Sequence, residues 1–259
     1  MAAGNEHSRA KAGDFPNMSL IDERLAQAIS ASVVTEIRDV IKLMRSIDDL
    51  LPPTDGLKWF NLLYLRVTED VGESSGSTEW ENPRYVERLA VRFSGLYFGA
   101  IVHWLRDRNR VARSWVPLFR GRQRGGIARV QFAIAGMNAH INRDLAIALV
   151  QTSEEQGVVP RHDSPEHRDF NRVNGHLETA AEKTKEFLAT GIVGEIDQNL
   201  GRIDDTVALW SVRKARETAY ANSEILWQLR ATPILGSAFL TNLDRLVALS
   251  SEGLLVPRT

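Results

Sequence analysis

The chain of 259 residues contains no cysteine. Disulfide bonds, zinc sites built on thiolates, iron–sulfur clusters and thiol nucleophiles are therefore excluded. No apolar run approaches the roughly 18 residues that a membrane helix needs, and residues 1–15 mix charged side chains without the apolar core of a secretory signal. These absences predict a cytoplasmic protein with no membrane partner.

An excess of charge of one sign is missing as well. The 32 lysine and arginine residues nearly balance the 33 aspartate and glutamate residues, which gives a net charge of −1 at pH 7. Proteins that bind nucleic acid usually carry a basic excess, so no nucleic-acid partner is expected. Only six of the 32 basic residues are lysine. This preference for arginine is typical of GC-rich genomes and indicates a bacterial source.

Helical periodicity dominates what is present. Apolar residues recur at helical spacing over residues 20–51, and two consecutive prolines then end the pattern. Asp55 is the predicted N-cap of the next helix, and Asn82 precedes a proline in the arrangement that favours a helix start. Strand-like alternation is brief and lies inside longer helical patterns. The sequence predicts an all-α fold, a single-domain multi-helix bundle of about eight helices.

The helical pattern divides the chain into one domain and two tails. Residues 1–18 are predicted to be a disordered or extended N-terminal tail, residues 19–250 the single all-α domain, and residues 251–259 a C-terminal tail. Within the domain, the pattern predicts later helices over residues 83–106, 127–153, 164–188, 195–229 and 234–249.

The helix predicted over residues 127–153 combines side chains that rarely occur together. Its apolar sequence includes four polar residues within seven positions, namely Asn138, His140, Asn142 and Asp144. Buried polar groups cost free energy unless they find partners. Because an α-helix turns by about 100° per residue, His140 and Asp144 lie together at one edge of the apolar stripe. An apolar surface rimmed by hydrogen-bonding groups is typical of a ligand pocket.

The pair formed by His140 and Asp144 admits three roles. As a catalytic pair, Asp144 orients the imidazole and raises its basicity, and His140 transfers a proton. As metal ligands, the two need a third protein group, for which Asp169 and His176 are candidates. In the third role the two side chains satisfy each other and fix helix packing. The sequence leaves these roles open.

Further candidates for substrate binding lie on three predicted helices. Asn174 falls on the buried stripe of the helix over 164–188, where its amide needs a partner. A cluster that includes aromatic side chains follows Asp55, and other candidates flank His140. The residues predicted to bind substrate are Asn138, Asn142, Asn174, Asn61, Trp59, Tyr64 and Met137.

Motifs for common cofactors are absent. The glycine-rich segment 120–126 has neither the Walker spacing nor the dinucleotide fingerprint, and no strand precedes it, so it is expected to be a solvated loop. No cofactor is predicted. Late in the chain, one or both of Arg213 and Arg216 are expected to form a structural ion pair with an acidic group such as Asp169 or Asp205.

The stretch AGMNAHINRDL at residues 135–145 resembles the hallmark of a bacterial family known as domain-of-unknown-function family 5995. Supporting similarity lies at residues 55–61, 169–174 and 210–216, and the resemblance extends over about residues 35–230. It implies a cytosolic all-α protein of about this size, without an established common activity.

These observations favour an enzyme that acts on a small, largely apolar substrate molecule. A cofactor-independent cyclase, isomerase or lyase of bacterial specialised metabolism fits, with His140 and Asp144 as its catalytic acid–base pair. The first alternative is a metal-dependent hydrolase of phosphoesters that uses His140, Asp144 and Asp169. The second is a non-catalytic binding or scaffold protein. The sequence leaves open whether the chain forms an oligomer.

Overall fold

The computed structural model describes residues 18–74, 79–190 and 212–257, with the backbone alone over 178–190. Within this part of the chain there is no strand, and the predicted all-α single-domain fold with a helix number near eight is confirmed. The α-helices are α1 (Leu20–Ala31), α2 (Ile37–Leu50), α3 (Gly56–Ser74), α4 (Pro83–Arg106), α5 (Val116–Gly121), α6 (Arg129–Ala139), α7 (Leu145–Gln156), α8 (Pro165–Thr190), α10 (Val212–Leu229) and α11 (Pro233–Leu254). Short 3₁₀ turns, η1 (Arg108–Arg110) and η2 (Arg113–Trp115), join α4 to α5.

The helix ends lie where the capping chemistry places them. A carboxylate oxygen of Asp55 accepts the N–H of Leu57 at 3.0 Å. The side chain of Asn82 accepts the N–H of Tyr85 at 3.1 Å. Both bonds satisfy backbone donors that a helix leaves free at its start. Gly157 ends α7 with φ of 67°, a left-handed conformation that glycine adopts at little cost.

The helical pattern over residues 20–51 corresponds to two helices. Asp39 explains the break, because its Oδ2 accepts the N–H groups of Thr35 at 2.9 Å and Glu36 at 3.2 Å. These bonds hold the chain in a non-helical conformation just before α2, in the manner of a helix cap. The predicted tail over residues 1–17, and residues 195–211 of the predicted helix over 195–229, lie outside the described residues.

The C-terminal boundary also differs from the prediction. The last helix extends to Leu254, past residue 251, where the sequence pattern places the start of a tail. Gln131 explains the extension, because its Nε2 donates to the carbonyl oxygens of Leu254 at 2.8 Å and Val256 at 3.0 Å. The side chain of Leu255 is buried in the main core. Residues 251–257 therefore belong to the folded domain.

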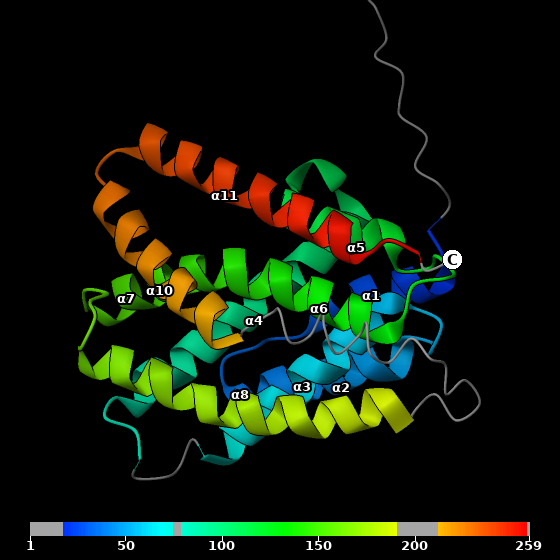
Figure 1. The fold of residues 1–259 in the computed structure, drawn as a ribbon, viewed down its shortest axis with the longest axis horizontal. Helices are drawn as coiled ribbons and strands as arrows, with labels where there is room; N and C mark the ends of the chain where they lie inside the picture. Colours follow the sequence, from blue (N-terminus) through cyan, green and yellow to red (C-terminus); the bar gives the residue numbers. More distant parts are fainter. Residues whose placement is uncertain (1–17, 75–78, 191–211, 258–259) are drawn as a thin grey trace, which may run out of the picture.

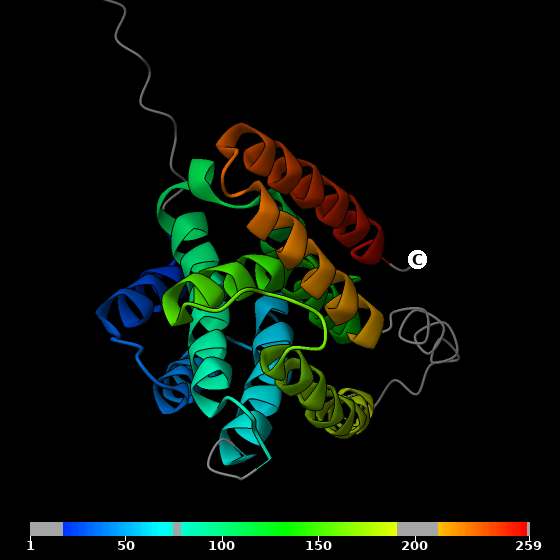
Figure 2. The ribbon, with the colours of Figure 1, turned by 90° about the vertical axis from the view of Figure 1, so that its left-hand side faces the viewer.

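The two helices α6 and α7 form one long central rod. In Figure 1 this rod lies between α11 above and α8 below, and Figure 2 shows α4 and α3 beside it. The rod packs on α3 and α11 along α6, and on α4 and α10 along α7. It is therefore enclosed by other helices along its length, and its polar side chains must find partners inside the protein. Among the described helices, none has the length and apolar character that crossing a membrane requires.

Two glycines allow α3 and α6 to approach closely. A Cβ atom on Gly136 would lie 2.3 Å from Cγ of Phe60, and a Cβ on Gly56 would lie 2.4 Å from Cδ1 of Phe132. Real Cβ contacts are essentially never shorter than 3.0 Å. The close approach brings the Phe60 ring within 5.8 Å of the His140 ring, measured between centroids. The packing of the central rod thus depends on these two positions.

Candidate active site

The central rod contains a π-helical turn, η3 (His140–Asp144). The N–H of Leu145 bonds to the carbonyl of His140, five residues earlier, where an α-helix would bond four residues earlier. Such turns are rare and frequently occur at functional sites. The structure therefore differs from the uninterrupted α-helix predicted over 127–153, yet Nδ1 of His140 still lies 3.2 Å from Oδ2 of Asp144.

Asp144 is completely buried and has protein partners on both oxygens. Its Oδ2 accepts the indole N–H of Trp115 at 2.8 Å and faces His140, and its Oδ1 pairs with Arg143. Burial alone would raise the pKa of this carboxyl, but the His140 hydrogen bond and the Arg143 charge outweigh it and hold the pKa below its ordinary value. Asp144 is thus an ionised acceptor, and Nδ1 of His140 carries the proton between them.

The imidazole of His140 is held between aromatic rings. It stacks on Phe93 with 3.5 Å between centroids and 5° between planes, and it meets the edge of Tyr64 at 4.7 Å. Burial lowers the pKa of His140, and Asp144 offsets this only in part, so the ring is neutral at pH 7. Its Nε2 is buried without a hydrogen-bond partner among the described residues. An unsatisfied buried acceptor costs about 1–3 kcal/mol.

A partly open cavity of about 80 Å³ adjoins this imidazole. Most of its wall is apolar and comes from helices α2, α3, α4, α6, α7, α8 and α10 together with η3. His140 is one of the few polar residues in the wall, whereas Asp144 lies behind it, away from the cavity. A ligand in the cavity would therefore meet the imidazole and not the carboxylate.

Two of the residues predicted to bind substrate line the cavity with His140. Tyr64 lies on α3 and Met137 lies one helical turn before His140 on α6. Phe93 and Arg216 line it too, although the sequence analysis did not assign them to the pocket. Phe93 lies in an ordinary helical pattern that gave no signal. Arg216 lies within the family-like segment 210–216, so its position could have been inferred from that similarity.

The two asparagines beside His140 hold a neighbouring helix instead of lining the cavity. Nδ2 of Asn138 donates to the carbonyl of Val247 at 3.0 Å and to Oγ of Ser251 at 2.9 Å, both on α11. Asn142 donates to the side-chain oxygen of Asn138 at 2.7 Å. Their polar groups are therefore used to attach α11 to the central rod.

Asn61 and Trp59 also have structural partners. Nδ2 of Asn61 donates to the carbonyl of Met44 at 2.9 Å, and its oxygen accepts the hydroxyl of Tyr97 at 3.2 Å. The ring of Trp59 is covered by the guanidinium of Arg129 at 4.2 Å. Neither residue lines the cavity. Both were predicted substrate contacts, and the structure places them in the packing of α3.

Asn174 fulfils the expectation that its buried amide needs a partner. Its Oδ1 accepts Nε–H of Arg216 at 2.7 Å. Asn174 itself is not part of the cavity wall, so it supports a residue that is. Its role is to position Arg216 and not to contact a ligand in the cavity.

The structure does not bring Asp169 to His140 and Asp144. Its two oxygens accept the backbone N–H groups of Glu81 at 3.0 Å and Asn82 at 2.7 Å, which fixes the start of α4. Arg172 pairs with the same carboxylate. These bonds explain its burial without a metal, and the ligand set of His140, Asp144 and Asp169 is not assembled among the described residues.

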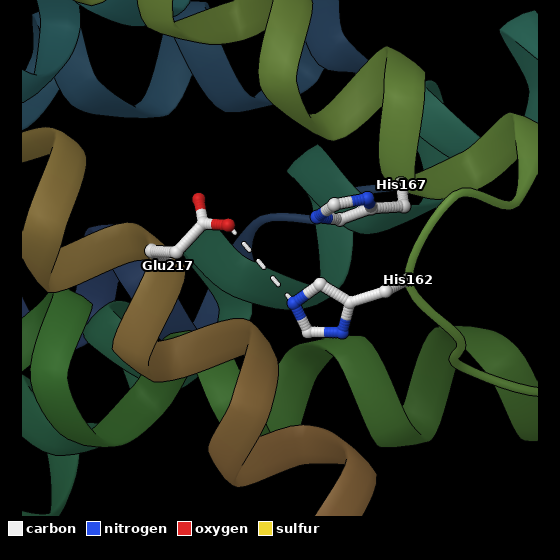
Figure 3. Close-up of side chains that lie close together, drawn as sticks. All are labelled: His162, His167 and Glu217. Carbon is white, nitrogen blue, oxygen red and sulfur yellow. Dashed lines mark ion pairs between the residues drawn. The ribbon is translucent and has the colours of Figure 1, made fainter.

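A different group of potential ligands lies at the junction of α8 and α10. Within the described part of the chain, His162, His167 and Glu217 bring one ligand atom each within 4.8 Å of one another (Figure 3). Nδ1 of His167, however, accepts the N–H of Asp163 at 3.1 Å, so Nε2 carries the proton of the neutral ring. Metal-bound histidines normally donate from the second nitrogen, so His167 is oriented against metal binding.

Most residues of the basic segment 120–126 are exposed, in agreement with the predicted solvated loop, but one of its arginines is buried. Arg122 is only 4% exposed. Its Nε donates to Asp55 at 2.8 Å and its second terminal nitrogen donates to Asp22 at 2.6 Å. This buried network joins α1, the start of α3 and the end of α5. The arginine is therefore structural.

The sequence model of DUF5995, described as a family of unknown function, matches residues 37–257. The chain belongs to this family, and the resemblance carried by residues 135–145 is confirmed. No curated protein and no solved structure matches the chain.

The buried imidazole predicts how stability depends on pH. Burial lowers the folded-state pKa of His140, and in the unfolded chain the pKa returns to about 6.5. Below that pH the unfolded chain binds a proton that the folded chain does not bind, so we expect the free energy of unfolding to fall as the pH drops from 7.5 to 5.5. His167, with its pKa also lowered by burial, contributes with the same sign.

Urea unfolding at the two pH values measures this effect. A His140→Asn variant should show a shallower pH dependence, because one of the contributing imidazoles is gone. A free energy of unfolding that is higher at pH 5.5 than at pH 7.5 would contradict the prediction.

Proposed function

We propose that this protein is a small-molecule enzyme in which His140 transfers a proton to and from a largely apolar substrate. The observation that supports it is the free Nε2 lone pair of a neutral, buried imidazole in the wall of an apolar cavity. Asp144 fixes the ring from the opposite side by accepting Nδ1–H. This is the arrangement by which a carboxylate orients a histidine base.

The chemistry that fits such a base is proton transfer at carbon or oxygen. Isomerisation, elimination and cyclisation each need one group that removes a proton and returns it, and a neutral imidazole does both near pH 7. We place the reaction in bacterial specialised metabolism, in the cytoplasm and without a cofactor. A phosphoester hydrolase built on His140, Asp144 and Asp169 is not favoured, because the Asp169 oxygens are held at the start of α4.

Deuterium exchange tests the proposal without knowledge of the substrate. The protein is incubated in D₂O with a panel of small apolar ketones, esters and unsaturated acids, and mass spectrometry detects deuterium incorporated at carbon. We expect wild-type protein to catalyse incorporation into some members of the panel. His140→Asn should lower that rate by about 10²–10⁴-fold, because asparagine keeps an N–H donor for Asp144 but supplies no base.

His103→Asn serves as the matched control, because His103 lies near the end of α4 outside the cavity wall. It should keep the wild-type rate. Equal rates for His140→Asn and wild type, or no incorporation into any member of the panel by wild type, would count against the proposal.

A further inference from the structure

Arg216 lies in the wall of the same cavity and has no part in the proton transfer proposed for His140. Its side chain is buried, with the residue 5% exposed. Nε donates to Asn174 at 2.7 Å, and one terminal nitrogen donates to the carbonyl of Phe170 at 2.7 Å. The guanidinium carbon lies 4.0 Å from the centroid of the Phe170 ring. These contacts hold the guanidinium in one place.

The guanidinium of Arg216 has no counter-ion within the described residues, since no carboxylate there forms an ion pair with it. The predicted pair with Asp169 is absent, because that carboxylate binds elsewhere, and Asp205 lies outside the described residues. Glu166 also lines the cavity, but one of its oxygens accepts the amide of Asn82 at 3.0 Å. Among the described residues, the hydrogen-bond acceptors that Arg216 uses are neutral.

A buried charge without a pair is costly, by several kcal/mol. Burial lowers the pKa of Arg216 to about 9, and the nearby Glu217 raises it, so the group stays charged at neutral pH. Neutral carbonyl and amide oxygens compensate a cation only in part. An anion that enters the cavity would supply the missing charge in a place where little water screens the attraction.

We propose that the cavity binds an apolar molecule that carries a carboxylate, with Arg216 holding the carboxylate. This rests on the proposed function, in which the apolar part of the same molecule lies against Phe93 and His140. Arginine binds a carboxylate through two parallel N–H bonds, and an aromatic wall suits a flat apolar body. The geometry thus names the substrate class as an apolar carboxylic acid.

A ligand series that changes only charge tests this on the unmodified protein. Isothermal titration calorimetry at pH 7 compares 3-phenylpropionate, 3-phenylpropan-1-ol and 3-phenylpropylamine. We expect the acid to bind at least tenfold more tightly than the alcohol, and the amine to bind most weakly. Equal or tighter binding of the alcohol overturns the proposal. Failure of the acid to bind up to its solubility limit overturns it as well.

Substitutions then locate the charge. Arg216→Met should remove the preference for the acid and leave binding of the alcohol, and Arg216→Lys should keep part of the preference. Arg230→Met is the matched control, because Arg230 directly follows the end of α10 with its guanidinium 4.0 Å over the Trp227 ring, outside this cavity. If Arg216→Met does not fold, the ligand series on wild type still decides.

A substitution that fills the cavity tests whether the acid and the alcohol bind there. Ala90 lines the cavity, so Ala90→Phe should weaken binding of the acid and of the alcohol alike. Unchanged binding of the acid by this variant overturns the proposal.

These titrations measure binding and not proton transfer. Wild-type protein that binds acid and alcohol equally but exchanges deuterium through His140 would overturn the carboxylate proposal alone, whereas acid-selective binding without exchange would overturn the proposed enzymatic function alone.

Discussion

A Gly136→Ala substitution is expected to lower the free energy of unfolding by about 3 kcal/mol. The added methyl group would lie 2.3 Å from Cγ and 2.6 Å from Cβ of Phe60, and the Cβ atom cannot move without the backbone of α3. Overpacking of this kind typically costs 1–3 kcal/mol and occasionally more. Urea unfolding followed by circular dichroism measures the change.

The matched control is Gly95→Ala in the interior of α4. No atom lies within 4 Å of a Cβ added there, so the same change should stabilise the protein by about 0.5–1 kcal/mol through helix propensity. The two substitutions therefore have opposite signs. A Gly136→Ala variant as stable as wild type would show that α3 and α6 are not packed as closely as described.

Replacement of Asp144 by alanine is expected to cost about 3–5 kcal/mol. The change leaves the indole N–H of Trp115 and Nδ1–H of His140 without an acceptor in a fully buried place, and Arg143 loses a partner. Loss of one member of a buried charge network has this magnitude. Asp144→Asn keeps one side-chain oxygen and should cost less, about 1–3 kcal/mol.

Asp49→Ala provides the baseline, because Asp49 is exposed on α2 and a surface substitution there should change the stability by no more than about 0.5 kcal/mol. Thermal and urea unfolding of the three variants give the comparison. An Asp144→Ala variant within 1 kcal/mol of wild type would mean that the carboxylate is dispensable, and the orientation of His140 would then need another cause.

Local chemistry made much of the fold predictable from the sequence. Asp55 and Asn82 cap helices because their side chains reach donors two and three residues later, and these two bonds are local in sequence. The break between α1 and α2 could not be predicted from apolar spacing, because that spacing continues through it. The break depends on Asp39, whose carboxylate accepts backbone N–H groups three and four residues earlier in the chain. The extension of α11 depends on Gln131, more than a hundred residues away, and such contacts leave no local pattern.

In the candidate site, too, contacts between near neighbours in sequence could be predicted and contacts between distant helices could not. His140 and Asp144 are four positions apart on one rod, so their contact could be predicted from spacing alone. Which polar groups open onto the cavity could not be predicted, because that depends on how other helices pack. Asn138 and Asn61 looked like ligand contacts, yet α11 and α2 supply their partners. Arg216 looked like half of an ion pair, and within the described part of the chain its hydrogen-bond partners are a carbonyl and an amide oxygen.

The π turn makes the length of the central rod as important as its side chains. Residues on either side of it belong to different helical registers, and the packing of α7 on α4 and α10 matches only the present offset. Gain of a further residue between positions 139 and 145 would rotate α7 by about 100° relative to α6. Leu145 and Leu149, now buried, would then turn out of the interior. An insertion in this segment is therefore expected to disrupt the packing of α7 on its neighbours.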